Sequence, residues 1–391
     1  MMSILIRKVK TAFRMRFMDV VALLTSRLMG LLWCGYVIMK QTTFRVPRDR
    51  RRLIVYLTPG DILVNGGVMS IYNQATSSRM ILVDAAVVLT TFPRSKKIYA
   101  VNRAFPNNER IWRWGQVMRL VRRFDDVLIH IPDYYAGRFF DDLRREEVGL
   151  LRACNFFSIN IMDQNIIMMP KVEELAGLRK LTKRITQTCA HTKYSGQEFA
   201  EKFMMPTIWI PAHWCMDCYP EFQFEQKERR IVYSPDDHPR KIEILDLLRQ
   251  EFSDFEFYEI RDITFPKFMN VVARSFFTIT FGEGLDGYYS SPLRKHSMSF
   301  SVYNEEFFSK DIDWCAVWNV FHDYDDMKKH LVEKMKECLS SKIVYERRVN
   351  EVRDAVRYVK AMDAERGEVF MDRLCRFYAG NFDYYPRSNN A

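Results

Sequence analysis

The chain has 391 residues, 48% hydrophobic and 28% charged, which is the balance of a soluble globular protein with room for two domains. Its net charge of +10 would suit a nucleic-acid binder, but residues 1–52 hold 12 Lys/Arg and only 2 Asp/Glu. The remaining 339 residues therefore hold 47 charges of each sign. A neutral body without a visible basic-aromatic groove argues against nucleic acid as a partner.

Residues 1–50 are predicted to form a helical extension that binds a membrane surface. The apolar run Val20–Met39 has about the ~20 residues of a spanning helix, but Arg27 interrupts it. Upstream, apolar and basic residues alternate at helical spacing, which is typical of an amphipathic helix on an anionic surface. Three arrangements stay open: interfacial or monotopic attachment, a true span, and a helix packed on the protein itself.

The eight cysteines are scattered over the chain and form no secreted disulfide framework, so a reducing compartment is expected. Cys215 and Cys218 make one C-x-x-C pair, and without a second pair free thiols are favoured over a zinc site. These features predict a cytoplasmic protein, peripheral or monotopic at the cytoplasmic face of the membrane.

From Leu53 onward, short apolar runs alternate with helical patterns, which predicts an α/β fold with parallel sheets. Residues 51–225 are interpreted as a first Rossmann-like domain. Its expected strands are Leu53–Leu57, Asp126–His130, Phe156–Ile161, Ile185–Ala190 and Thr207–Ile210, and its expected helices are Glu109–Phe124, Arg138–Ala153, Lys171–Lys180 and Ser195–Lys202.

The polar stretch Glu221–Arg229 is the predicted linker. After it, strand and helix patterns alternate again, which predicts a second Rossmann-like domain, residues 226–340. Residues 341–391 are expected to add a C-terminal helix and a polar tail that frays. The expected strands are Arg230–Tyr233, Glu256–Glu259, Phe276–Phe281 and Ser299–Val302, and the expected helices are Arg240–Glu251, Phe265–Ala273, Asp323–Lys342 and Tyr345–Phe370.

Motifs at strand ends carry most of the functional information, because ligands bind outside the carboxyl ends of the strands in open α/β sheets. In the first domain, a predicted helix is preceded by Asn65, Gly66 and Gly67. Glycines at the start of a helix let the backbone approach a ligand closely. An ordinary tight turn would look the same. His130 ends a predicted strand and either contacts a substrate or is satisfied by packing at the strand end.

In the second domain, Arg240 and Lys241 begin a helix just past a strand end. They either neutralise a diphosphate or are simply solvated. The stretch FGEGLDGYYSSP, from Phe281 to Pro292, contains three of the chain's 15 glycines in one loop. Its Glu283 follows a strand directly and either accepts hydrogen bonds from sugar hydroxyls or caps its own loop.

This stretch, the Asn-Gly-Gly turn and the repeated Rossmann pattern resemble bacterial glycosyltransferases of the GT-B fold, in the broad family 4-like group that makes cell-surface polysaccharides. The resemblance covers roughly Leu53 to Val320 and includes HIPDYY, NIMDQNI, ITQTCAHTKYS and FSVYNEEFF. The resemblance implies that residues 51–225 bind the acceptor and that residues 226–340 bind the donor. In that family the second domain holds the nucleotide sugar, and two glutamates eight positions apart serve the donor. Glu283 matches the first, near the sugar, whereas the position of the second, which binds the ribose, is Ser291.

The resemblance implies a hexosyltransferase-like enzyme that moves a sugar, with retention, from a nucleotide diphosphate sugar to a saccharide or lipid-linked acceptor. It implies no metal and no other cofactor. The departure at Ser291 leaves an alternative, a non-catalytic relative that binds a sugar nucleotide or a partner glycosyltransferase. The residues expected at the site are Glu283 and His130 for catalysis, Arg240, Lys241, Gly284, Asp286, Gly287, Tyr288 and Ser291 for the donor, and Asn65, Gly66 and Gly67 at the cleft.

Overall fold

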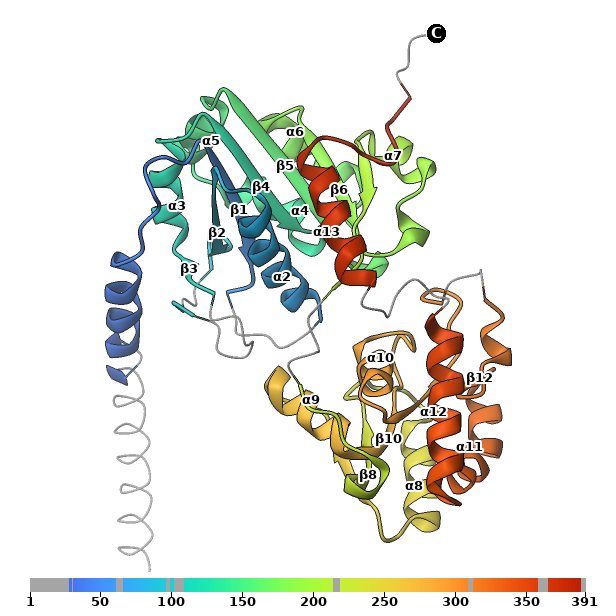
Figure 1. Cartoon of the computed structure of the whole chain (residues 1–391). Coiled ribbons are helices and arrows are strands. Elements are labelled where there is room, and N and C mark those ends of the chain that lie inside the picture. Colours follow the sequence, from blue (N-terminus) through green and yellow to red (C-terminus); the bar gives the residue numbers. More distant parts are fainter. Residues whose placement is uncertain are drawn as a thin grey trace, which may run out of the picture.

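A computed structural model describes residues 28–29, 31–60, 66–95, 99–101, 109–213, 219–308, 312–357 and 365–387. The chain folds into two lobes, each built around one parallel sheet (Figure 1). In this part of the chain, no helix is both long enough and apolar enough to cross a membrane. The predicted amphipathic helix, much of the apolar run and the C-x-x-C pair lie outside the described residues.

The first lobe contains a seven-stranded sheet of order β3-β2-β1-β4-β5-β6-β7, whose strand order reverses between β1 and β4. All its neighbouring strands are parallel, so their carboxyl ends share one edge. The strands are β1 (Arg52–Thr58), β2 (Ala85–Thr91), β3 (Ile111–Trp112), β4 (Asp126–Pro132), β5 (Phe156–Asp163), β6 (Ile185–Cys189) and β7 (Thr207–Trp209).

Helices cover both faces of this sheet because its central strands are apolar on both sides. Along β1, Leu53 and Val55 point into the core formed with α3 to α6, while Ile54 and Tyr56 point into the core formed with α2. The helices are α2 (Gly66–Ile81), α3 (Trp114–Val121), α4 (Asp133–Asp142), α5 (Arg145–Arg152), α6 (Ala176–Leu181) and α7 (Gln197–Phe203), with 3₁₀ turns η1 (Ile166–Met168), η2 (Val172–Leu175) and η3 (Thr192–Tyr194).

The second lobe contains a five-stranded parallel sheet of order β12-β11-β10-β8-β9, and its order reverses between β8 and β10. Its strands are β8 (Glu228–Tyr233), β9 (Glu256–Glu259), β10 (Ser275–Ile279), β11 (Met298–Val302) and β12 (Val320–Phe321). Its helices are α8 (Lys241–Glu251), α9 (Phe265–Arg274), α10 (Gly287–Arg294), α11 (Tyr324–Leu339) and α12 (Lys342–Arg357), with 3₁₀ turns η4 (Phe224–Gln226) and η5 (Trp314–Ala316).

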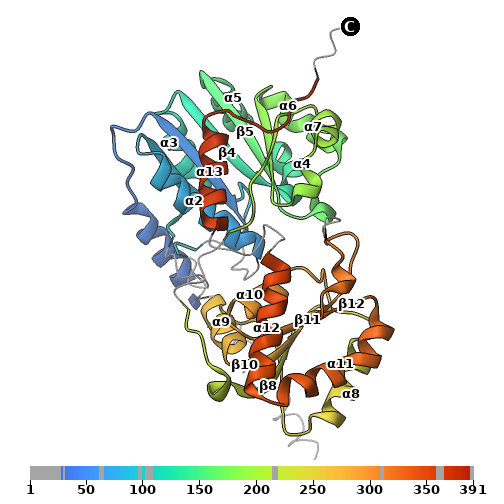
Figure 2. The same ribbon diagram turned by 45° about the vertical axis from the view of Figure 1, so that its right-hand side comes forward.

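The C-terminal region divides between the lobes. The sequence predicts one helix over Tyr345–Phe370, but the structure has α12 on the second lobe and a separate helix α13 (Glu365–Tyr378) beside α2 of the first lobe (Figures 1 and 2). Phe370 and Leu374 of α13 are fully buried there. The chain therefore crosses back to its first domain.

The tail that follows α13 is held in place, so the expectation of a frayed end is wrong for residues 379–387. Thr207 of the edge strand β7 donates its backbone N–H to the Tyr384 carbonyl at 2.9 Å. Asp383 forms an ion pair with Arg373 at 2.6 Å. An edge strand offers unpaired backbone groups, and the tail satisfies some of them.

Candidate functional site

The glycine loop, defined here as residues 280–286, leaves β10 at the point where the strand order of the second sheet reverses. The β8–α8 loop, residues 234–240, leaves the neighbouring strand at the same edge. Such a switch point is where open α/β sheets bind ligands. The two loops are tied together, because the Phe281 amide donates to the Ser234 hydroxyl at 3.0 Å.

Two glycines of the loop are required by close approach. A Cβ on Gly282 would lie 2.7 Å from the Asp236 carboxylate of the β8–α8 loop. Gly284 has a φ of +86°, and a Cβ there would lie 2.6 Å from the Phe308 ring and 2.8 Å from the Val302 carbonyl oxygen. A larger residue at Gly284 would push the loop out of the switch point, whereas one at Gly282 would force the Asp236 side chain to move.

Between these glycines, Glu283 faces the first domain. Its Oε1 accepts a hydrogen bond of 2.6 Å from Asn165 Nδ2, which lies just after β5. Burial raises the pKa of the Glu283 carboxyl, the charges of Asp236 and Glu306 raise it further, and the bond from Asn165 opposes that rise. Glu283 is therefore a carboxylate held between two sheet edges.

Asn165 is itself fixed by the first domain. Asp133, at the carboxyl end of β4, accepts hydrogen bonds through Oδ2 from the amides of Gln164 at 2.8 Å and Asn165 at 3.1 Å. The Asn165 Oδ1 accepts from the Ile167 amide at 2.9 Å and caps η1. The backbone amide and the side-chain oxygen of Asn165 are thus both committed within the first domain, which aims its Nδ2 at Glu283 of the second.

A second bridge joins the lobes beside this one. Lys193 Nζ donates to the carbonyl oxygens of Glu305 at 2.7 Å and Glu306 at 3.0 Å, and the Tyr194 hydroxyl donates to the Glu306 carbonyl at 2.6 Å. Sequence reasoning singled out neither Asn165 nor these two residues individually. The only available signal was that both segments occur within the stretches that carry the family resemblance.

Asp286 caps the helix that follows the glycine loop. Its Oδ1 accepts from the amides of Tyr288 at 2.8 Å and Tyr289 at 3.0 Å. Although the residue as a whole is only half-buried, desolvation of its carboxyl and the nearby charge of Glu283 raise the Asp286 pKa to about 7. Gly287 begins α10, and the half-buried Tyr288 packs edge-to-face on Phe268.

The predicted phosphate-binding pair is committed elsewhere. Lys241 is buried, and its Nζ donates to the carbonyls of Ser234 and Asp236, each at 3.0 Å, and to Glu259 Oε1 at 3.2 Å. These three bonds use every N–H of the ammonium group. Lys241 therefore supports the β8–α8 loop in this conformation.

Arg240 points away from the loop toward helices of its own domain. Its Nε pairs with Glu243 and its Nη2 with Asp325, each at 2.6 Å. In this conformation its guanidinium group is engaged by two carboxylates, so a diphosphate would have to compete with both. Neither member of the predicted pair is presented to the cleft as a free cation.

Ser291 lies inside α10 with 0% of its surface exposed, and its hydroxyl oxygen is buried without a hydrogen-bond partner. The interpretation of Ser291 as a ribose contact therefore does not fit the described conformation. The helix turns this position toward the core, and the half-buried Ser290 lies next to it.

His130 is placed within β4, two residues before its end, with 1% of its surface exposed. Its ring stacks on Tyr56, with ring centroids 4.1 Å apart. Nδ1 is 3.1 Å from Asn160 Nδ2, and Nε2 is 3.4 Å from the Tyr378 hydroxyl of α13. Burial and the charge of Arg52 lower the His130 pKa to about 3. Of the two interpretations of His130, packing at the strand end fits the described structure and contact with a substrate does not, because the returning helix α13 covers the ring.

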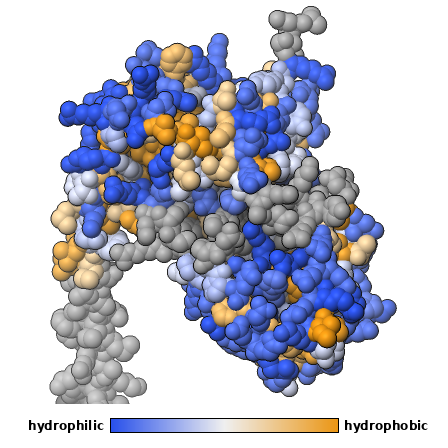
Figure 3. All heavy atoms as spheres, in the orientation of Figure 1, coloured by the Kyte–Doolittle hydropathy of each residue, from blue (hydrophilic) through white to orange (hydrophobic). Residues whose placement is uncertain are grey.

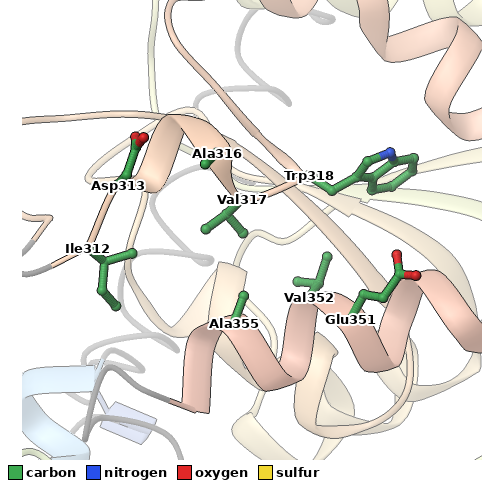
Figure 4. A pocket seen from close by; sticks show the side chains of 8 residues that line it. All are labelled: Ile312, Asp313, Ala316, Val317, Trp318, Glu351, Val352 and Ala355. Atoms are coloured by element: carbon green, nitrogen blue, oxygen red, sulfur yellow. The ribbon is translucent and has the colours of Figure 1, made fainter.

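Gly66 and Gly67 form the first turn of α2 rather than a turn ahead of it, and Asn65 lies outside the described residues. Elsewhere, a cavity of about 580 Å³ lies between the η5 segment and α12 (Figure 4). Its lining is mainly apolar, with Asp313 and Glu351 as charged residues, and includes no residue of the glycine loop or the first domain. Among the described residues, no group of three or more His, Cys, Asp or Glu is placed to hold a metal ion.

Comparison with known proteins identifies the architecture. An alpha-glucosyltransferase solved with UDP-glucose and DNA containing an abasic site matches with a TM-score of 0.56 and 10% identity, over 83% of this chain and 98% of that one. HepE of Anabaena, solved with UDP-glucose, matches with a TM-score of 0.51 and 8% identity, over 84% and 99% of the two chains. The chain has the GT-B glycosyltransferase fold. No protein-family model matches the sequence. No curated protein matches it either.

Within the GT-B fold, the two Rossmann-like domains expected from the sequence are present, and their carboxyl edges meet at the Asn165–Glu283 contact. The glycine loop is thus at the junction of the two domains, whereas the apolar cavity is confined to the second.

Proposed function

We propose that this protein is a glycosyltransferase that moves a sugar from a nucleotide diphosphate sugar to a saccharide or lipid-linked acceptor. The observation that carries the proposal is the position of Glu283, on a loop that requires glycine, between the carboxyl edges of two Rossmann-like sheets. The GT-B fold supports it, and so do the nucleotide sugars bound by the two structural neighbours. The donor class proposed on that ground is a UDP-sugar, hexosyl in type.

In the proposed reaction, the bond between the anomeric carbon and the diphosphate oxygen breaks, and the acceptor hydroxyl oxygen bonds to that carbon. The acceptor proton leaves with the nucleotide diphosphate. The anomeric carbon gains positive charge as the bond breaks, and the Glu283 carboxylate is placed to stabilise it or to hold the sugar hydroxyls. We propose that the transfer proceeds with retention, needs no metal, and serves surface polysaccharide or glycan synthesis.

A second candidate, a non-catalytic GT-B-like protein that binds a sugar nucleotide or a partner glycosyltransferase, is favoured by specific observations. Lys241 is committed to its own loop, and Ser291 is buried. A chain that had lost transfer activity would have no need to present a cation to the leaving diphosphate.

The test is a thermal-shift screen with UDP, UDP-glucose and other nucleotide sugars, followed by an assay for nucleotide release with candidate acceptors. A ligand that binds only the native state raises the melting temperature. At 100 times its Kd, such a ligand adds about 2.7 kcal/mol to the free energy of unfolding. We expect a shift with a nucleotide sugar and release of nucleotide by the parent protein. Binding without release by any donor would support the non-catalytic candidate. The lack of any shift would contradict the transferase and leave only the candidate that binds a partner glycosyltransferase.

A further inference from the structure

An exposed apolar helix leaves the first domain. Residues 31–42 are helical, and so are Leu28 and Met29 before them. The exposed surface of Leu31 is 72%, and the described part of this helix holds no charged residue before Lys40. Figure 3 shows the apolar side chains gathered on its surface at the lower left. The exposed large apolar residues are Leu28, Met29, Leu31, Leu32, Trp33, Tyr36, Ile38 and Met39.

These residues are spread around most of the helix circumference, so no single neighbouring helix could cover them. A helix that is apolar nearly all round belongs in an apolar environment, because each large side chain exposed to water forgoes the favourable free energy of transfer out of water. Water alone is therefore an unsuitable surrounding for this part of the chain.

The other end of the helix is fixed to the first domain. Val37 is buried, and the buried Gln41 donates through Nε2 to the Ile111 carbonyl of the edge strand β3 at 2.9 Å. Gln116 returns a bond of 2.8 Å to the Gln41 carbonyl. Phe44 packs on Trp112 with ring centroids 5.4 Å apart. The apolar helix is thus attached at a defined point of the sheet.

The residue types change along the helix in the order of the layers of a bilayer. The first described turns carry Leu28, Met29, Leu31 and Leu32, and the neighbouring rings of Trp33 and Tyr36 follow. After Ile38 and Met39 comes Lys40, whose Nζ lies 5.8 Å from the Tyr36 ring centroid. Aromatic rings favour the membrane–water interface, and basic residues favour anionic headgroups. The basic residues Arg45, Arg48, Arg50 and Arg51 follow directly.

We propose that this helix enters an anionic bilayer with its N-terminal turns, leaving Trp33 and Tyr36 at the interface and Lys40 with the following arginines at the headgroups. Gln41 and Phe44 then fix the orientation of the first domain against the membrane, at the cytoplasmic face. A second copy of the chain is a poorer occupant, because one neighbouring helix would leave part of the apolar surface in water, and parallel packing would bring the same basic residues together. The proposal is independent of glycosyl transfer.

The test is flotation of the full chain with vesicles of phosphatidylcholine and phosphatidylserine. Leu31→Glu is compared with Val83→Glu, because Val83 is 73% exposed on the body of the first domain. Since a carboxylate in the hydrocarbon layer is costly, Leu31→Glu is expected to lower vesicle partitioning about tenfold or more, whereas Val83→Glu leaves it unchanged. Point substitution is preferred to deletion of residues 1–48, which would also remove the Gln41 and Phe44 contacts.

A second measurement locates the helix in the bilayer. The fluorescence of Trp33 is taken as the difference between the parent and Trp33→Phe. Vesicles with brominated acyl chains should quench this signal in the parent protein, and should quench it less in Leu31→Glu. Flotation of Leu31→Glu equal to the parent, with no quenching of the Trp33 signal, would overturn the proposal. A different result would assign the helix to self-association and would also overturn the proposal. In that case the parent would sediment as a dimer without lipid and would not float with vesicles, and Leu31→Glu would be a monomer.

Discussion

The glycine loop and the β8–α8 loop differ in what they do with charge, although both leave neighbouring parallel strands at one sheet edge and both lead into a helix. The glycine loop sends Glu283 outward to Asn165 of the other domain. The β8–α8 loop turns Lys241 inward, onto two of its own carbonyls and Glu259. One loop therefore presents its charged group to the cleft, and the other uses its charged group as internal support.

The difference follows from the acceptors that lie near each charged group. Carbonyls of residues 234 and 236 converge where the lysine stem ends, so the ammonium group satisfies buried acceptors that would otherwise be costly. Glu283 lies near Asp236 and Glu306, which repel it, and meets its donor only across the cleft. Proximity to a strand end is therefore not enough to place a charged residue in a site.

The largest expected effect tests the outward carboxylate. Glu283→Gln should lower the rate of sugar transfer by about 10²–10³-fold, the usual loss when one group that stabilises developing charge is removed. The amide keeps the side-chain volume and a carbonyl oxygen for the Asn165 bond, so the melting temperature should change little. Turnover and thermal unfolding are measured on the same preparations, and a variant as active as the parent would remove Glu283 from the reaction.

The next effect tests the inward cation. Lys241→Met keeps the apolar stem but leaves two buried carbonyls unpaired, so we expect about 2–4 kcal/mol lower stability. Arg240→Ala serves as the control, because its ion pairs lie in solvent, where they contribute little to stability. Thermal unfolding separates the two. If Lys241→Met unfolds like the parent and instead loses affinity for UDP but not for uridine, Lys241 is a phosphate ligand after all.

The sequence predicts the frame of the molecule well where the signal is local. Alternating strand and helix patterns identify the two Rossmann-like domains, and the glycines of the FGEGLDG stretch indicate a loop in close contact with other backbone. The failures share a non-local cause. The strand β2, AAVVLTT, was not predicted, and the break between α12 and α13 depends on which domain each helix packs against.

The candidate site is predicted less well than the frame. Glu283 was found from its loop, but its partner Asn165 is 118 positions away in the chain. His130 occurs near a strand end, as a catalytic histidine would, and only the returning helix α13 shows that it is buried. Such contacts form between residues far apart in sequence, and a single sequence carries no signal of them.

The third effect tests the cap of the glycine loop through pH. The pKa of Asp286 is raised to about 7, so between about pH 4 and 7 the native state keeps a proton that the unfolded state has lost. The contribution of this group to stability therefore falls as the pH rises through that window. Asp286→Asn keeps a capping oxygen without charge and should be more stable than the parent by about 1–2 kcal/mol at pH 8, and similar to it at pH 5.

The measurement is the melting temperature of both proteins across that pH range. A difference that is the same at pH 5 and pH 8 would show that Asp286 does not titrate in this window. Asp286→Ala should lie about 1 kcal/mol below Asp286→Asn at every pH, because it also removes the cap.

The smallest expected effect concerns the helix after the loop. Ser291 is fully buried and its hydroxyl has no partner, so Ser291→Ala should leave stability unchanged or raise it by less than about 1 kcal/mol. It should also leave the affinity for UDP unchanged, because the side chain does not reach the cleft. Ser290→Ala is the matched control on the neighbouring, half-buried position. Titration of UDP followed by thermal shift decides the matter: a clear loss of affinity in Ser291→Ala alone would mean that α10 rotates when the nucleotide binds and that the ribose contact passes through Ser291.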